Sequence, residues 1–167
     1  MDWGKQGEGS KLRPRAVVDD NVVRIKFLND DGSLSELPQE LDLKPVIEIE
    51  VEHPTPNGLT TSKALALIDT GADHRVIDCA FAERLQLTPA GSTTTSGVGG
   101  FVDVMHYQIS YRIATNGGVK ALQGAFVAPS LAETGRKYQV ILGMSVLQKG
   151  RLIMDAQTHD YLFEFSD

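Results

Sequence analysis

Hydrophobic and polar residues alternate along several short segments of this chain. Apolar and charged residues alternate over Val22–Phe27, and the following Asn29–Ser33 segment is rich in turn-forming residues. The alternation is clearest where Ile47, Ile49 and Val51 fall on one face of an extended segment and glutamates fall on the other. Both segments are therefore predicted to be β-strands with one exposed face.

Helical patterns are few and short. Ser62–Ile68 reads as a mostly buried strand. Only Cys79–Gln86, where Phe81 and Leu85 lie four residues apart, and Ser145–Gln148 have the spacing of a helix. The chain has no internal repeat and no regular alternation of strands and helices, so the predicted class is all-β, a barrel or a sandwich.

Length and composition narrow the class of protein. The chain has 167 residues, 41% of them hydrophobic, and a formal net charge of −6, which fits one globular domain. The acidic balance and the lack of a basic run argue against binding to nucleic acid. No apolar run approaches the roughly 18 residues of a membrane span, so we expect no membrane partner.

The N-terminal segment and the scattered cysteine and histidines lead to four further expectations. Residues 1–15 are rich in glycine and mixed in charge, and are expected to form a mobile arm. They lack the apolar core of a secretory signal, which predicts a cytoplasmic protein. The single Cys79 fits a reducing compartment. The histidines are too dispersed for a zinc site, so neither a metal nor another cofactor is expected.

The segment Leu67–Asp73 carries the strongest candidate chemistry. Asp69, Thr70 and Gly71 directly follow an apolar strand, which would hold the carboxylate at the edge of a rigid core while the glycine lets a ligand approach the backbone. An ordinary turn in which the aspartate bonds its own backbone is the alternative reading of these three residues.

Two further segments change the balance between these readings. Ser96–Val104 is a glycine-rich turn between apolar residues, and Val140–Gly143 is an apolar strand that ends in glycine. Taken singly, they could be a surface loop and a core strand. In this order, the three segments resemble the retropepsins, the single-domain aspartic proteases of retroviruses and their cellular and bacterial relatives.

The resemblance implies a fold and a site. The fold would be a closed or partly open retropepsin-type β-barrel with one or two short helices, formed by residues 41–167. Residues 1–40 would be an N-terminal extension, with a strand and a turn in 16–40. The glycine-rich hairpin would be the flap that closes over substrate. The catalytic residues would be Asp69, Thr70 and Gly71, and the residues that bind substrate would be Ala72, Asp73, His74, Val76, Val98, Gly99, Gly100 and Ile141.

The count of catalytic motifs predicts the assembly. Peptide hydrolysis by this chemistry uses two carboxylates that share a proton, and the chain contains one Asp-Thr-Gly. We therefore expect a symmetric homodimer that hydrolyses extended polypeptide segments as an aspartic endopeptidase. The alternative is a catalytically inactive module of the same fold that binds peptides or only dimerises.

Some positions depart from the viral pattern. Met144 stands where the viral enzymes have an arginine that pairs with the aspartate at the position of Asp73, and Arg75, Arg136 or Arg151 could replace it. Longer loops are expected around 91–95 and 128–138. The alternation over Asp160–Phe165 predicts a C-terminal strand, which could pair within one chain or between two.

Overall fold

A computed structural model of the chain describes residues 20–39, 43–97 and 99–166. The predictions made for residues 1–15 and for Val98 lie outside these ranges. The described residues form the following elements: β1 (Val22–Arg24), β2 (Lys26–Leu28), β3 (Leu34–Ser35), β4 (Lys44–Thr55), β5 (Gly58–Ile68), β6 (Arg75–Ile77), α1 (Cys79–Arg84), β7 (Gly91–Gly97), β8 (Gly100–Thr115), β9 (Gly118–Ala128), a 3-10 turn (Ala132–Thr134), β10 (Val140–Leu142), α2 (Met144–Leu147), β11 (Gly150–Asp155) and β12 (Asp160–Phe165).

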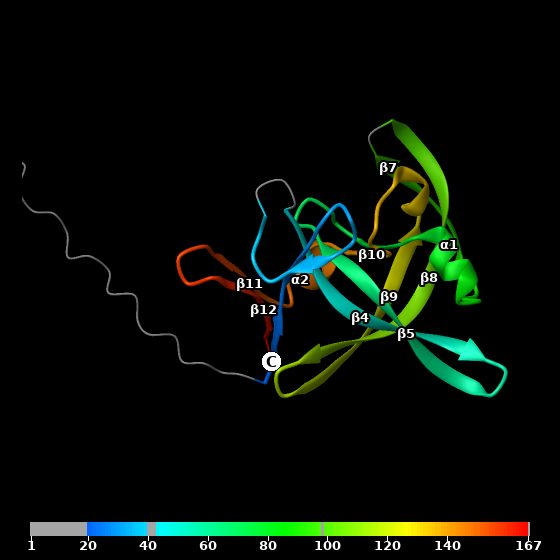
Figure 1. Ribbon diagram of the computed structural model, residues 1–167. Helices are drawn as coiled ribbons and strands as arrows, with labels where there is room; N and C mark the ends of the chain where they lie inside the picture. Colours follow the sequence, from blue (N-terminus) through cyan, green and yellow to red (C-terminus); the bar gives the residue numbers. More distant parts are fainter. Residues whose placement is uncertain (1–19, 40–42, 98, 167) are drawn as a thin grey trace, which may run out of the picture.

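The larger sheet closes on itself to form a β-barrel. Its strands follow the order β3-β2-β4-β5-β10-β6-β9-β8-β7, and β4 also pairs with β8 through Glu50 and Arg112. The closed part therefore runs through β4, β5, β10, β6, β9 and β8 (Figure 1). The predicted all-β class with short helices is confirmed, and it takes the form of a barrel rather than a sandwich.

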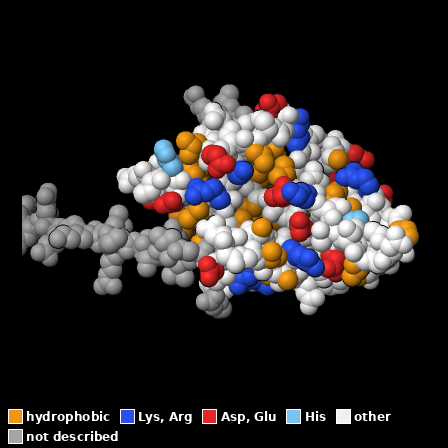
Figure 2. All heavy atoms as spheres, turned by 60° about the horizontal axis from the view of Figure 1, so that its bottom comes forward, with side chains coloured by type: hydrophobic (Ala, Val, Ile, Leu, Met, Phe, Trp, Pro, Cys, Tyr) orange, Lys and Arg blue, Asp and Glu red, His pale blue; other side chains and the backbone are white. Residues whose placement is uncertain are grey.

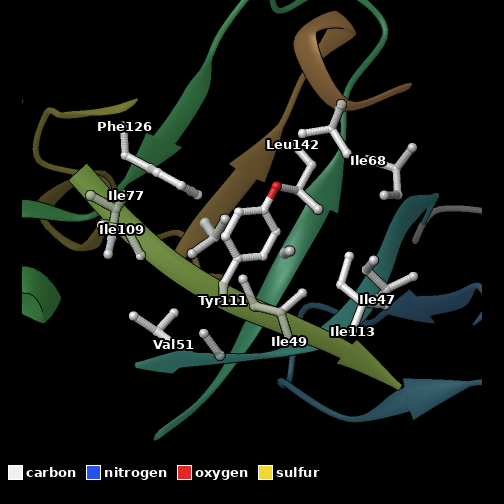
Figure 3. Close-up of a cluster of buried hydrophobic side chains, with 14 of the residues drawn as sticks. Ile47, Ile49, Val51, Ile68, Ile77, Ile109, Tyr111, Ile113, Phe126 and Leu142 are labelled. Carbon is white, nitrogen blue, oxygen red and sulfur yellow. The ribbon is translucent and has the colours of Figure 1, made fainter. Parts of the chain in front are cut away.

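The core fills the inside of this barrel. Tyr111 and Phe126 meet edge to face with their ring centroids 5.4 Å apart, surrounded by branched aliphatic side chains from the facing strands (Figure 3). Ile47, Ile49 and Val51 of β4 are all buried there, as their alternation with glutamates predicted. This packed interior makes a rigid support for the turns at the ends of the strands.

A smaller sheet with the order β1-β12-β11 lies beside the barrel. The single strand predicted over Val22–Phe27 is wrong, because the segment divides at Ile25 between the two sheets. β1 pairs with β12 and β2 pairs with β4, and the amide of Ile25 donates a 2.8 Å hydrogen bond to the carbonyl of Tyr161. Val22 and Val23 are both buried although they are neighbours in the sequence, so simple alternation does not describe this segment. The C-terminal strand is present and pairs within its own chain.

The two helices lie near their expected positions. The first begins at Cys79, where the Asp78 side chain accepts a hydrogen bond from the amide of Phe81. The second begins at Met144, one residue before the predicted start. The loop expected around residues 91–95 is wrong, because these residues belong to β7, which pairs with β8 along its whole length.

The surface carries charges of both signs. Lysine, arginine, aspartate and glutamate side chains are interspersed over the face shown in Figure 2. Within residues 20–39, 43–97 and 99–166, no helix is long and apolar enough to cross a membrane. The same residues contain no group of three or more histidine, cysteine, aspartate or glutamate side chains that could hold a metal ion.

Candidate active site

Asp69 lies where the buried strand β5 ends. β10 runs parallel to β5, with Leu142 beside Ile68, and the amide of Asp69 donates to the carbonyl of Leu142 at 3.2 Å. The Asp69 side chain is half-buried, and its Oδ1 accepts a 2.8 Å hydrogen bond from the amide of Gly71. The carboxylate is thus held in one orientation by the turn that it begins.

The segment Asp69–His74, called the aspartate turn below, is joined to α2 through the backbone. The amides of Met144 and Ser145 donate to the carbonyls of Ala72 and Asp73 at 2.7 and 3.0 Å. Gly143 permits this approach, because a Cβ at this position would overlap the carbonyl oxygen of Ala72. Glycine is therefore required at the end of β10 for a steric reason.

A cleft of about 750 Å³ opens beside the aspartate turn. It lies between this turn and the β7–β8 hairpin, which rises from the barrel at the top of Figure 1. Its walls come from the turn and β6 (Gly71–Val76), β7 (Ser92–Ser96), β8 (His106), β9 (Ala125 and Val127) and α2 (Ser145). A cleft of this size at a sheet edge can hold several residues of an extended peptide.

The structure brings many of the predicted site residues together. Gly71, Ala72, Asp73, His74 and Val76 all line the cleft. Thr70 is exposed beside it, and no hydrogen bond of its side chain is found among the described residues.

The other described site residues do not line the cleft. Asp69 and Thr70 directly precede Gly71, the first residue of its wall. Ile141 pairs in register with Val76 and so shares its face of the sheet. Gly99 and Gly100 form the tip of the hairpin with φ angles of 118° and 114°, which glycine adopts far more readily than other residues. Phe101 is 81% exposed, and strand alternation puts it on the opposite face of the hairpin from His106.

Sequence reasoning missed the β7 side of the cleft. Ser92–Ser96 line it together with His106 and Ser145. This segment has no apolar alternation because neither of its faces packs into the core. The clue to this strand lies in the glycine-rich turn and in β8, because β7 pairs with β8 residue by residue from the turn back to Gly91.

The arginine that would pair with Asp73 has no replacement among the three candidates. Arg75 donates to the Tyr111 hydroxyl at 3.4 Å, Arg136 donates to Thr134 at 3.1 Å, and Arg151 forms an ion pair with Glu164 at 2.9 Å. Asp73 itself is exposed, so water can solvate its carboxylate.

Beneath the cleft, Arg75 is directed into the barrel. A Cβ on Gly124 would come within 2.6 Å of the guanidinium carbon of Arg75, so this glycine makes room for the side chain. Burial raises the pKa of Tyr111, and the hydrogen bond and charge of Arg75 partly oppose that rise. The phenol therefore stays neutral at physiological pH and accepts the hydrogen bond from Arg75.

Comparison with known families assigns the chain to one of them. The sequence pattern of the aspartyl protease family matches residues 51–146, and the chain belongs to that family. The family predicted from the three sequence segments is thus confirmed. No curated protein matches the chain.

Similar solved structures include three proteases. The Simian Foamy Virus (mac) protease has 17% identity and a TM-score of 0.40, over 62% of this chain and 91% of that one. The EIAV protease, solved with an inhibitor, has 21% identity and a TM-score of 0.47, over 71% of this chain and all (100%) of that one. A retropepsin-like aspartic protease from Rickettsia conorii has 18% identity and a TM-score of 0.44, over 86% of this chain and 89% of that one.

Proposed function

We propose that this protein is an aspartic endopeptidase that cleaves extended polypeptide segments as a homodimer, with Asp69 of each subunit as the catalytic carboxylate. The observation that carries the proposal is the position of Asp69. It is half-buried at the end of a core strand, oriented by the amide of Gly71, and followed closely in the same turn by Gly71–His74, which line the cleft.

The proposed reaction uses the two Asp69 carboxylates as one acid–base unit. One carboxylate takes a proton from a water molecule, whose oxygen bonds to the carbonyl carbon of the substrate, while the protonated partner donates to the carbonyl oxygen. The C–N bond then breaks as the protonated aspartate donates its proton to the nitrogen and the other aspartate takes a proton from a hydroxyl of the tetrahedral intermediate. The products are a carboxylic acid and an amine, and the two aspartates again share one proton.

Several features of the chain support a second copy as the partner. The chain supplies one Asp-Thr-Gly, so the acid–base pair is incomplete in one subunit. Thr70 is exposed beside Asp69, where its hydroxyl can bond the same turn of a second subunit.

The smaller sheet adds an edge on which the second copy can pair. Among residues 20–39, 43–97 and 99–166, β11 pairs with β12 alone. Met154 of β11 and Met144 of α2 are 47% and 41% exposed. Apolar surface is therefore present on β11 and on α2, the helix that contacts the aspartate turn. An unpaired strand edge with apolar side chains is a common surface for self-association.

The deciding experiment is the cleavage of an unbiased peptide mixture between about pH 4 and pH 7. The wild type is compared with Asp69→Asn, which keeps the shape of the side chain and removes its charge. Asp31→Asn, on an exposed turn outside the cleft, is the matched control. We expect cleavage by the wild type and by the control and none by Asp69→Asn.

Dilution tests the homodimer in the same assay. Specific activity should fall as the concentration drops below the dimer dissociation constant, together with the dimer fraction in sedimentation. Activity that survives in Asp69→Asn would contradict the catalytic assignment. Folded, dimeric protein that cuts nothing would favour the peptide-binding module instead.

A further inference from the structure

The β7–β8 hairpin has two chemically different faces. Gly91, Thr93 and Thr95 pair with His106, Val104 and Val102. Because side chains alternate along a strand, Thr93, Thr95 and His106 lie on one face of this hairpin. All three line the cleft beside the aspartate turn, and so do Ser92, Thr94 and Ser96 from the other face of β7. His106 is the one described residue of β8 in the lining, so the face that carries His106 is the one that both strands of the hairpin bring to the cleft.

The hydroxyls of the cleft face have no partner within the described protein. On the opposite face, the Thr94 hydroxyl donates to the Asp103 carboxylate at 2.6 Å. Among the described residues, no such bond is found for the side chains of Thr93 or Thr95. Both residues retain some exposure in the free chain, so water satisfies these hydroxyls until a ligand displaces it.

Two further polar atoms at the cleft lack partners. His106 Nδ1 and Ser145 Oγ are both covered from solvent and have no hydrogen-bond partner in the part of the chain that the structure describes. The His106 ring lies against Gly91, where a Cβ would come within 2.8 Å of Cε1. Ser145 lies on the other side of the cleft, next to the aspartate turn, where its amide donates a hydrogen bond to the carbonyl of Asp73.

Charged groups contribute little to this part of the cleft. The carboxylate of Asp73 is exposed, where an ion pair with a ligand would be weakened by water and salt. The guanidinium of Arg75 is directed to Tyr111. The polar groups of the wall are therefore mostly hydroxyls and the imidazoles of His74 and His106, which together can both donate and accept hydrogen bonds.

We propose that the space between β7 and the aspartate turn is a subsite for an uncharged, hydrogen-bonding side chain of the peptide, of the kind found in glutamine and asparagine, with Thr93 and Thr95 as specificity-determining residues. This inference rests on the proposed function and names the substrate class of the same cleft. An amide side chain has an NH2 group that donates and an oxygen that accepts. A threonine hydroxyl can both donate and accept a hydrogen bond, so it can pair with either end of the amide.

An apolar side chain would fit this wall poorly. Once bound, it would displace water from the two hydroxyls without replacing the hydrogen bonds that this water makes, and polar groups left unpaired disfavour binding. A carboxylate would face Asp73, and an ammonium would lose hydration that hydroxyls only partly replace. The hydrophobic side chains of Val76, Val127 and Ala72 contact the aliphatic part of the ligand from the floor of the cleft.

The experiment compares peptides that differ at one position. A positional library of ten-residue peptides carries glutamine, leucine, glutamate or lysine at each place in turn. The wild type is assayed for kcat/KM, and the non-cleaving Asp69→Asn variant is assayed for peptide affinity by fluorescence anisotropy. At one position we expect glutamine to exceed leucine by about tenfold or more in both assays.

The variant Thr93→Val/Thr95→Val tests the residues themselves. Valine keeps the shape and the strand preference of threonine and removes only the hydroxyl. We expect the preference to shift toward leucine by about tenfold, with an unchanged circular dichroism spectrum and melting temperature. The matched control is Thr60→Val, an exposed threonine of β5 outside the cleft, which should keep the glutamine preference.

The outcomes separate this inference from the proposed function. Cleavage with a preference for leucine or a charged residue at every position would overturn the subsite and leave the endopeptidase standing. A glutamine preference that survives Thr93→Val/Thr95→Val would overturn the assignment to these residues. No cleavage, together with selective binding of glutamine peptides, would support the subsite and contradict the endopeptidase.

Discussion

The amide of Met144 donates a 2.7 Å hydrogen bond to the carbonyl of Ala72. This bond joins the start of α2 to the aspartate turn, although the two residues are far apart in the sequence. The contact depends on Gly143, which leaves room for the Ala72 carbonyl. The orientation of Asp69 is therefore coupled to the end of β10 as well as to its own turn.

Gly143→Ala should impair catalysis strongly. The added methyl group overlaps the backbone of the aspartate turn, and a displacement of about 1 Å at a catalytic group costs roughly 100-fold in rate. We expect kcat/KM to fall by about that factor or more, measured on the best peptide from the cleavage screen. Gly118→Ala is the control, since a Cβ there meets nothing within 4 Å. Equal activity of the two variants would contradict the coupling.

Asp78→Asn should destabilise the fold. The Asp78 carboxylate is 4% exposed, and it accepts hydrogen bonds from the amides of Phe81, Leu131 and Ala132 at 3.1, 2.8 and 3.0 Å. An asparagine has only one acceptor oxygen, so its NH2 group would face an amide donor. We expect a loss of about 2 kcal/mol in the free energy of unfolding, measured by urea denaturation. Asp31→Asn should change it little, and similar midpoints for both variants would argue against this role.

Ala72→Ser should move the acidic limb of the pH–rate profile downward. A serine at position 72 would add a hydroxyl within the aspartate turn, and a hydrogen bond from it to the carboxylate would favour the charged form. Alanine lacks this group, so we expect the wild type to act at mildly acidic to neutral pH. The limb belongs to the aspartate pair and not to one residue. The measurement is kcat/KM against pH for both proteins, and an unchanged limb would refute the argument.

Asp155 should stabilise the β11–β12 turn only while it is ionised. Hydrogen bonds from the amides of Gln157 and Thr158 lower the pKa of Asp155 below its usual value of 3.8. The unfolded chain then binds more protons than the folded chain, so this contribution is complete well above pH 3.8 and is lost as the pH falls through the lower, folded value. We expect Asp155→Asn to lower the melting temperature at about pH 6, with the difference shrinking toward about pH 3. A constant difference would show that the charge is not involved.

The sequence predicted the parts of the molecule that a strong local pattern determines. Glutamates alternate with Ile47, Ile49 and Val51 because one face of β4 enters the core. The Asp69-Thr70-Gly71 segment was recognised because its order with two distant segments is characteristic of a family, and a family match now covers it. The site roles that follow from the resemblance stay predictions until the variants are measured.

The errors arose where pairing between distant segments decides the structure. The segment divides at Ile25 because β1 pairs with β12 and β2 pairs with β4. Nothing within residues 22–27 indicates that the two halves pair with different strands. The sequence predicts a loop for the residues of β7 because Ser92–Ser96 line a cleft wall rather than the core, and so lack the alternating apolar residues of a buried strand. The division at residue 40 also stays a prediction, since β1 and β2 pair with strands from the rest of the chain.

The pairing of Val22 with Glu164 sets an order of events during synthesis. About 140 residues separate these two partners, which a ribosome translating about 5–20 residues per second adds in roughly 10 s or more. The barrel strands can begin to pair in that interval, whereas the three-stranded sheet beside them cannot be completed. If this sheet carries the contact between subunits, two nascent chains cannot associate through it before their last strand is complete.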